Sequence, residues 1–442
     1  MKPPTLSVAY MQDGARLHYA QPMGLHLEGV LSALYTDWYN DGSWLAGSLI
    51  RTVSLARPDL AERMRHMRLA ELSGVPVYDH KILGMMARLA FAKPTMSRPV
   101  GRWALRRTAR PRTAGPLAGS PKFPDALMGP MHCFTPETVR HYQRLGIKVL
   151  LDQIISPFRE FLRQRKIQEA RWPGWEPPTN SSAEAASLDR EEATLAAADH
   201  IVAAAGYVVD TLAEMGHGPS RVSLLPYPLR AEDYTFVDRS GRAGPITLGF
   251  VGAVNLRKGI PWLVETLKLL DPREFKCIVV GPRVLTDYGM AELAKVAQIV
   301  GPVPRREVQD WMRKFDILFF PSTCEGWGAV VAEAMATGLP VVTSPAGGSI
   351  VRDEVDGFVR PYDQPEQYAQ AIQLLAGNQD LRLAMGRSAR KRIEEFSVAW
   401  YGSGLRKIVE GVVHGETSAA TNPPQHGPGN RGPLAAPSSA GN

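Results

Sequence analysis

Two glutamates, Glu325 and Glu333, lie eight positions apart in a glycine-containing stretch, FFPSTCEGWGAVVAEAMATGLPVVTSPAGG at 319–348. A carboxylate accepts hydrogen bonds from sugar or ribose hydroxyls, so two at this separation could hold different parts of one long ligand. Gly326 and Gly328 would let an anionic group approach the backbone between them closely. The pattern therefore indicates a site for a ligand that carries both hydroxyl and phosphate groups.

The same stretch predicts the elements that must position these side chains. Apolar residues at 317–320 predict a buried strand that ends at Pro321. Residues 329–338, AVVAEAMATG, predict a helix that stops at its glycine, and 339–343 predict the next strand. The amides at a helix N-terminus have no helical partner and carry the positive end of the helix dipole. A phosphate-binding turn between the strand and the helix is therefore expected.

The stretch PSTCEGWGAVVAEAMATGLPVV resembles the pattern PSxxEGxGxxxxEAMAxGxPVV of the family 4 retaining glycosyltransferases. A bare pair of glutamates would more often be an ordinary turn, but the matching proline, glycine and alanine positions make the resemblance specific. It implies an α/β fold of two Rossmann-like doubly wound domains that face a cleft, known as the GT-B architecture. It also implies a hexosyl-type transfer from a nucleoside diphosphate sugar to an acceptor hydroxyl with retention of configuration.

The resemblance also implies roles for individual residues. Glu333 corresponds to the residue that binds the ribose hydroxyls, and Glu325 to the residue that meets the donor sugar. The implied donor-binding residues are Glu333, Gly326, Trp327, Gly328, Val303, Gly252 and Gly14. The implied catalytic residues are Glu325, Lys258, Arg257, His132 and Asp152. Contacts to the nucleobase come from the backbone near Val303, so the base cannot be read from side chains.

A basic loop precedes the motif. Residues 246–253 predict a buried parallel strand, and Arg257 and Lys258 follow it. Adjacent cations beside a strand end suit a diphosphate. In the resembled family this loop binds the donor diphosphate, and Lys258 matches the family's lysine before a glycine. Ala253 replaces the usual basic residue after the strand glycine, and Arg257 is expected to substitute for it.

In the first half of the chain, a strand–helix–strand pattern over 126–151 places His132 and Asp152 at strand ends, where α/β sheets bind ligands. Many members of the resembled family carry a histidine near here that meets the donor sugar or the acceptor. A histidine hydrogen-bonded within a loop is the alternative. Asp152 is expected to accept a hydrogen bond or a proton from an acceptor hydroxyl. Gly14 is expected either to close over the donor phosphates or to form a simple turn.

The length of 442 residues favours two domains. The expected organisation is an acceptor-binding domain at 1–240, a nucleotide-sugar domain at 241–390, a helix at 391–413 that crosses back to the first domain, and a disordered tail at 414–442. The three cysteines are far apart, which argues against a disulfide framework or a CxxC metal site. No D-x-D-type metal site was found, so no metal and no cofactor beyond the sugar nucleotide are expected.

The segment 81–112 carries many cations among apolar residues. It predicts either contact with an anionic membrane surface or a solvated basic face. Nucleic-acid binding is not expected, because the segment has few aromatic residues to stack on bases. The acceptor could accordingly be a glycan, a lipid-linked glycan or a small molecule. The N-terminal residues lack a signal-type apolar region, so a cytoplasmic location is expected, with peripheral contact at the inner face of the membrane as an option.

Two other kinds of function can be compared with the sequence. A sugar-nucleotide epimerase or phosphorylase could share the two-domain shape, but the spacing of the two glutamates and their surroundings argue against both. A catalytically silent protein that binds a nucleotide sugar or a membrane is the alternative from another class, and the Ala253 departure keeps it open.

Overall fold

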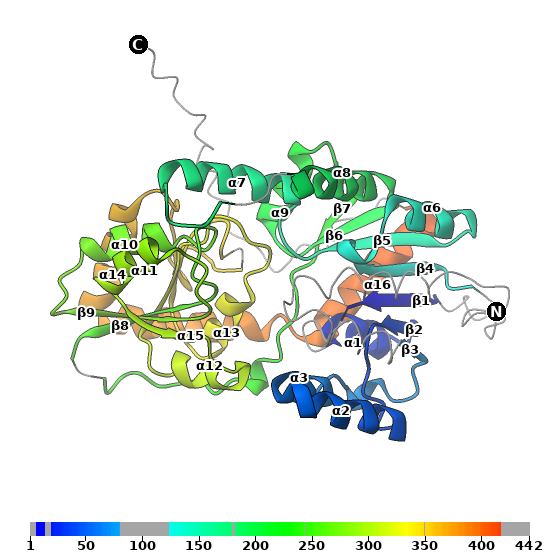
Figure 1. Ribbon diagram of the computed structural model, residues 1–442, viewed down its shortest axis with the longest axis horizontal. Coiled ribbons are helices and arrows are strands. Elements are labelled where there is room, and N and C mark those ends of the chain that lie inside the picture. The colour runs from blue at the N-terminus through cyan, green and yellow to red at the C-terminus, as the bar shows by residue number, and fades with distance from the viewer. Residues whose placement is uncertain are drawn as a thin grey trace, which may run out of the picture. The chain divides into compact units, whose positions relative to one another are not determined.

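The computed structural model describes residues 6–13, 19–79, 123–178, 182–242, 244–348 and 350–416. The chain divides into two compact units, each built on one parallel sheet (Figure 1). Within the described residues, unit 1 comprises 6–13, 19–79, 123–161, 182–230 and 395–416, and unit 2 comprises 162–178, 231–242, 244–348 and 350–394. The prediction of two Rossmann-like α/β domains is confirmed.

Unit 1 contains a seven-stranded parallel sheet in the order β3-β2-β1-β4-β5-β6-β7. Its strands are β1 (Val8–Gln12), β2 (Leu31–Thr36), β3 (Val77–Asp79), β4 (Ala126–Pro130), β5 (Lys148–Gln153), β6 (His200–Ala203) and β7 (Val222–Leu224). The chain first builds the sheet outward from β1 to β3 and then returns to add β4 on the other side of β1. The direction of winding therefore reverses between β1 and β4, the place where such sheets bind ligands.

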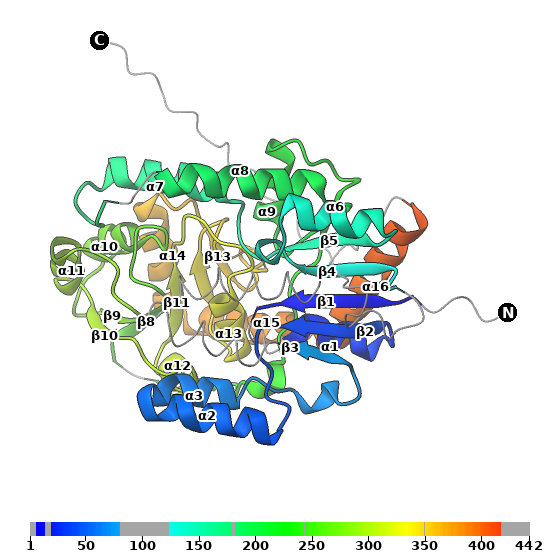
Figure 2. The same cartoon turned by 45° about the vertical axis from the view of Figure 1, so that its right-hand side comes forward.

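The described helices of unit 1 pack on its sheet and on one another. They are α1 (Ala20–Leu27), α2 (Trp44–Ala56), α3 (Pro58–Arg65), α6 (Pro136–Arg144), α8 (Ser182–Ala197), α9 (Gly206–Glu214) and α16 (Val398–His414), with α7 (Phe158–Arg171) beginning here and continuing into unit 2. Side chains of α6, α8 and α9 share one hydrophobic core with alternate strand residues such as Met11, Leu127 and Leu151. Helices α1 and α16 pack side by side (Figures 1 and 2).

Unit 2 contains a six-stranded parallel sheet in the order β10-β9-β8-β11-β12-β13. The strands are β8 (Ile246–Val251), β9 (Phe275–Val280), β10 (Gln298–Gly301), β11 (Ile317–Phe320), β12 (Val341–Thr343) and β13 (Gly357–Val359). The helices are α10 (Ile260–Lys268), α11 (Asp287–Ala294), α12 (Arg305–Met312), α13 (Ala329–Ala336), α14 (Pro365–Gly377) and α15 (Gln379–Glu394). The winding reverses between β8 and β11, and the strand, helix and strand predicted around the two glutamates appear as β11, α13 and β12.

Residues 162–178 differ from the expected domain division, because they pack with unit 2. Trp172 lies edge-on to Trp262 of α10, with ring centroids 5.1 Å apart. The indole N–H of Trp262 donates to the side-chain oxygen of Gln168 at 2.8 Å. This aromatic contact and this hydrogen bond attach residues 162–178 to α10 of unit 2.

The C-terminal helix also differs in detail. The helix expected at 391–413 is interrupted at 395–397, between α15 and α16, and there the Ser397 hydroxyl caps α16 by accepting from the Trp400 N–H. Gly14 and the basic segment 81–112 lie outside the described residues, so their predicted roles stay predictions. Across the described parts of the chain, no helix is both long and apolar enough to cross a membrane.

The contact between α1 and α16 depends on two facing glycines. A Cβ at Gly402 would lie 2.4 Å from the carbonyl oxygen of Gly24, whereas the nearest atom to a Cβ at Gly47 of α2 is 3.8 Å away. We expect Gly402→Ala to lower the free energy of unfolding by about 1–2 kcal/mol, because overpacking outweighs the better helix propensity of alanine. Gly47→Ala should instead stabilise by up to about 1 kcal/mol. Thermal unfolding of both variants tests this, and shifts of the same sign would contradict it.

Candidate functional site

The reversal point of unit 2 brings together the basic loop and the first glutamate of the motif. The loop at 252–259 follows β8, the loop at 321–328 follows β11, and these strands are neighbours in the sheet. Because the strands are parallel, both loops leave the same edge. They are also joined directly, since the backbone carbonyl of Arg257 accepts hydrogen bonds from the Thr323 N–H at 2.9 Å and from the Ser322 hydroxyl at 3.1 Å.

The carboxylate of Glu325 is the centre of this edge. It is 8% exposed, and its Oε1 accepts from the Arg257 guanidinium at 2.5 Å, from the Lys258 ammonium and from the Ser322 hydroxyl at 3.3 Å. Burial opposes ionisation of this carboxyl, but the charges of Lys258 and Arg257 outweigh burial and lower its pKa. Glu325 is therefore ionised in the folded protein.

The two cations differ in their surroundings. The Lys258 side chain is 12% exposed, and burial lowers its pKa although Glu325 opposes that effect. Its ammonium also lies 4.8 Å from the centroid of the Phe320 ring. Arg257 is more exposed and donates a second hydrogen bond to the Cys324 carbonyl at 2.8 Å. Two cations against one carboxylate leave an excess of positive charge that can attract an anion.

Glycines shape the backbone on both sides of this charge cluster. Gly328 is the N-cap of α13 with φ of 73°, and a Cβ there would lie 2.5 Å from the carbonyl oxygen of Gly347. Gly259, the N-cap of α10, has φ of 72° and would place a Cβ 1.9 Å from the Pro321 carbonyl oxygen. Any residue other than glycine would be strained at such φ values, and its side chain would not fit. The turn Gly326-Trp327-Gly328 thus leads directly into the N-terminus of α13, whose dipole favours an anion.

The second glutamate, Glu333, is the fifth residue of α13 and is 5% exposed. Its Oε1 accepts from the guanidinium of Arg305 at 2.5 Å. Burial raises its pKa, while the charge and hydrogen bond of Arg305 act against that shift. Val303 and Gly252, two other expected contacts, lie in the loops after β10 and β8, at the same edge of the sheet.

The reversal point of unit 1 carries a histidine–aspartate pair. His132 follows β4, Asp13 follows β1, and the His132 Nε2 lies 2.8 Å from the Asp13 Oδ1. The ligand atoms of Asp13, His132 and the buried Cys133 all lie within 4.8 Å of one another, so the three could approach one cation. A carboxylate beside an imidazole fixes the orientation and tautomer of the ring. His132 therefore lies at a strand end, as predicted, and its partner Asp13 was not indicated by the sequence.

Asp152 has a different environment from the one expected. It lies in β5 with no exposed surface, and its carboxylate accepts from the hydroxyls of Tyr10 and Tyr227 and from the amide of Gln21. Burial and the nearby charge of Asp152 raise the pKa values of both tyrosines, which keeps them as donors. A carboxylate enclosed in this way cannot reach an acceptor hydroxyl, so the predicted acid–base role of Asp152 is not supported in this conformation.

Comparison with known families identifies part of the chain. Residues 245–378 match the family model described as "Glycosyl transferases group 1". This region therefore resembles a group 1 glycosyltransferase domain. It contains both glutamates, the basic loop and the N-terminus of α13, so every element of the unit 2 site lies inside the matched residues.

The curated relatives align with only part of this chain. The D-inositol 3-phosphate glycosyltransferase of Xylanimonas cellulosilytica is 29% identical over 232 residues, which make up 47% of this chain and 55% of that protein. The chain thus spans about half the length of the curated relatives it matches.

Solved structures resemble the chain over most of its length. Anabaena Alr3699/HepE in complex with UDP and glucose has a TM-score of 0.54 at 15% identity and covers 92% of this chain and 99% of its own. Sucrose-phosphate synthase from Thermosynechococcus elongatus has a TM-score of 0.58 at 14% identity and covers 93% and 100%. At these identities the likeness shows the fold, which is that of GT-B glycosyltransferases.

Two residues beside the unit 2 site were missed by sequence reasoning. Arg305 contacts Glu333, as described above. Glu176, in the segment 162–178, accepts a hydrogen bond from the backbone N–H of Leu256 in the basic loop. Burial raises the pKa of Glu176. The basic pair at 305–306 was the only local signal for Arg305, and nothing local pointed to Glu176.

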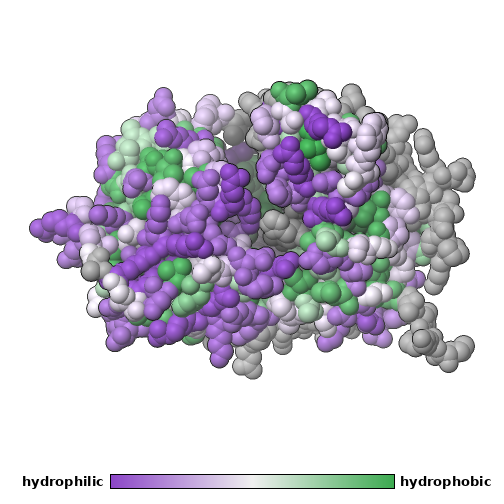
Figure 3. Space-filling model, turned by 90° about the horizontal axis from the view of Figure 1, so that it is seen from below, coloured by the Kyte–Doolittle hydropathy of each residue, from purple (hydrophilic) through white to green (hydrophobic). Residues whose placement is uncertain are grey.

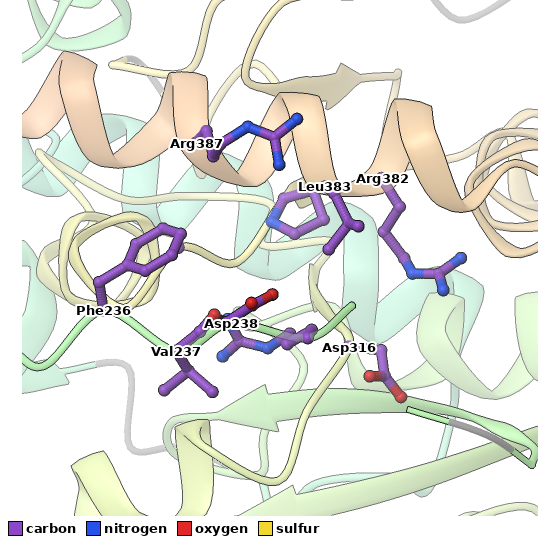
Figure 4. A pocket seen from close by; sticks show the side chains of 10 residues that line it. Phe236, Val237, Asp238, Asp316, Arg382, Leu383 and Arg387 are labelled. Atoms are coloured by element: carbon purple, nitrogen blue, oxygen red, sulfur yellow. Dashed lines mark hydrogen bonds between the residues drawn. The ribbon is translucent and has the colours of Figure 1, made fainter. Parts of the chain in front are cut away.

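A cavity of about 170 Å³ lies elsewhere in unit 2. Figure 4 shows part of its lining, with Leu383 and Arg387 on α15 and with Phe236, Val237 and Asp238 on the segment facing that helix. The buried Arg239, which also lines it, donates to the carbonyls of Met312, Phe315, Val237 and Thr337. Asp316 and Pro340 of the lining precede β11 and β12, so this cavity lies at the amino ends of the strands, opposite the edge that carries Glu325.

The charge cluster generates a stability prediction. Glu325→Ala leaves the buried Lys258 without its carboxylate, and breaking a buried pair in this way costs about 3–5 kcal/mol. The double variant Glu325→Ala/Lys258→Met should recover part of that loss, because it removes the stranded charge. Urea unfolding of the two variants tests this.

The pH dependence has a definite sign. Glu325 has a lowered pKa in the fold, so its stabilising contribution is present above the ordinary glutamate pKa and is lost as pH falls through the folded value. The difference between the wild type and Glu325→Ala should therefore narrow on acidification. For the stability prediction, the result that contradicts the pairing of Glu325 with Lys258 is a Glu325→Ala/Lys258→Met variant that is less stable than Glu325→Ala alone.

Proposed function

We propose that the protein is a retaining glycosyltransferase that moves a hexosyl group from a nucleoside diphosphate sugar to an acceptor hydroxyl. The observation that carries the proposal is the cluster of Glu325, Lys258 and Arg257 at the strand reversal point, beside the N-terminus of α13. The matched family and the resemblance of the motif support the same reaction class.

The proposed chemistry is electrostatic. When the donor binds, its diphosphate competes with the Glu325 carboxylate for Arg257 and Lys258, and the amides at the start of α13 face the same anion. Preorganised cations and a helix dipole stabilise the negative charge that develops on the departing diphosphate. Glu325, released in part from the cations, accepts hydrogen bonds from the donor sugar. The acceptor hydroxyl then attacks the anomeric carbon on the face that the diphosphate leaves, and its proton passes to an oxygen of the departing diphosphate.

The remaining roles follow the resemblance. Glu333 binds the ribose hydroxyls, and the backbone near Val303 contacts the base. His132, oriented by Asp13, meets the donor sugar or the acceptor. The Anabaena neighbour was crystallised with UDP and glucose, so uridine nucleotides are the first donors to test. A glycan, a lipid-linked glycan or a small molecule is the proposed acceptor class.

A nucleotide panel tests the donor site. UDP, GDP, ADP and their glucose conjugates are added to the wild type, Glu333→Ala and Glu325→Gln, and the unfolding midpoint is recorded. A ligand at 100 times its Kd raises the free energy of unfolding by about 2.7 kcal/mol. Because a hydrogen bond to a charged group contributes about 1.5–3 kcal/mol, Glu333→Ala should weaken nucleotide binding by roughly 10–150-fold. Glu325→Gln should reduce turnover of the sugar conjugate more than it reduces affinity.

The control is Glu366→Gln, an exposed glutamate in the first turn of α14, which should bind like the wild type. Binding of a sugar nucleotide without hydrolysis or transfer would favour the silent partner instead. The absence of a midpoint shift with every nucleotide, or unchanged binding and turnover in both motif variants, would refute the proposed donor site.

A further inference from the structure

Glu333 and Arg305 form an ion pair in which the glutamate is buried and the arginine is exposed. The Glu333 side chain is 6% exposed and the Arg305 side chain is 64% exposed, yet one guanidinium nitrogen of Arg305 lies 2.5 Å from the Glu333 Oε1. The guanidinium also hydrogen-bonds the side chain of Tyr234. One carboxylate oxygen of Glu333 is therefore engaged from the surface side.

Arg305 is the charged residue that acts on the Glu333 carboxyl among the described groups around it. Tyr234 is a neutral phenol, because burial and the charge of Glu333 raise its pKa to about 12. Arg390 of α15 approaches the same region but donates to the backbone carbonyls of Ala336 and Tyr234. The ionisation of Glu333 thus depends on Arg305, whose charge opposes the effect of burial.

The location of Arg305 is unfavourable by helix electrostatics alone. It is the first residue of α12, its N-cap is Pro304, and no side chain caps this helix end. The positive end of a helix dipole favours acidic side chains and disfavours cations. Arg306, the next residue, is also exposed at this helix end. Figure 3 shows that hydrophilic residues cover much of the face seen there. Contact with Glu333 therefore distinguishes Arg305 from its neighbour.

We propose that Arg305 is a positioning residue for nucleotide binding: it occupies one oxygen of Glu333, keeps this buried carboxylate charged, and leaves the other oxygen to the ribose hydroxyls. This inference rests on the proposed function, in which Glu333 binds the ribose. A carboxylate offers about four lone-pair sites, so the guanidinium and a diol can share it.

Loss of Arg305 has a defined consequence for nucleotide affinity. Without the guanidinium, burial raises the pKa of Glu333 further, and a protonated carboxyl is a weaker acceptor for hydroxyls. Arg305→Met should therefore bind nucleotide about tenfold more weakly at pH 7.5, the loss expected for one charge-assisted hydrogen bond. Its affinity should fall further toward pH 5.5, while that of the wild type changes less.

Calorimetric titration with UDP, GDP and ADP measures this for the wild type, Arg305→Met, Arg305→Lys and Arg306→Met. Arg305→Lys should restore part of the affinity, and Arg306→Met should bind like the wild type although it removes the same charge from the same helix end. In the Glu333→Gln background, Arg305→Met should change Kd by less than about twofold, because the residue acts through Glu333. Wild-type affinity with a flat pH profile in Arg305→Met would overturn the proposal. The proposal would also be overturned if the losses of nucleotide affinity caused by Arg305→Met and Glu333→Gln multiplied in the variant that carries both changes.

A second measurement needs no nucleotide and separates this inference from the proposed function. A carboxyl whose pKa is raised in the fold contributes stability below its unfolded pKa that is lost as pH rises through its folded pKa. The deficit in unfolding midpoint of Arg305→Met relative to the wild type should therefore grow from pH 4.5 to pH 8, and Glu333→Gln should abolish that growth. If the deficit grows with pH as expected but no nucleotide binds, the proposed donor site is wrong while the effect of Arg305 on the ionisation of Glu333 stands. If nucleotide binds but the deficit is independent of pH, the positioning role fails.

Discussion

The buried Glu325 carboxylate, held by Lys258 and Arg257, is the interaction on which the rest of unit 2 depends. A buried charge is tolerated only when it is paired, and the two cations lie on a different loop from the glutamate. The pair therefore fixes the loop after β8 against the loop after β11. Gly259 makes that approach possible, because its positive φ and the nearby Pro321 carbonyl oxygen exclude a side chain, and Gly328 does the same where the loop after β11 meets Gly347 in the loop after β12.

Strand order explains why charges gather at these points in both units. Each sheet reverses its winding beside its first strand, and the loops at that reversal diverge, which leaves room for polar side chains. In unit 2 this edge carries Glu325 with its cations, and in unit 1 it carries His132 with Asp13. The amino ends of the strands in unit 2 look different, since there Arg239 binds the carbonyls of helix and loop ends and has a structural role.

The sequence predicted what is local and missed what is distant. The strand, helix and strand around the motif were predicted because apolar runs, helix formers and Gly338 occur in a contiguous pattern, and they appear as β11, α13 and β12. Arg305, Glu176 and Asp13 were missed because their partners are 28, 80 and 119 positions away, and no local period links them. Asp152 was placed correctly near a strand end, but its register turns the carboxylate onto buried tyrosines, and only the tertiary packing shows this.

The two glutamates of the motif hold their charge by different means, and the difference follows from the groups each is proposed to meet. At Glu325, two cations outweigh burial and lower the pKa. An arriving diphosphate brings its own negative charge, so it can share those cations with the carboxylate. At Glu333, one cation only partly offsets burial and the pKa is raised. Ribose hydroxyls are neutral and cannot replace a cation, so the charge of Glu333 must be maintained by the protein throughout binding, which is the role that Arg305 is placed to perform.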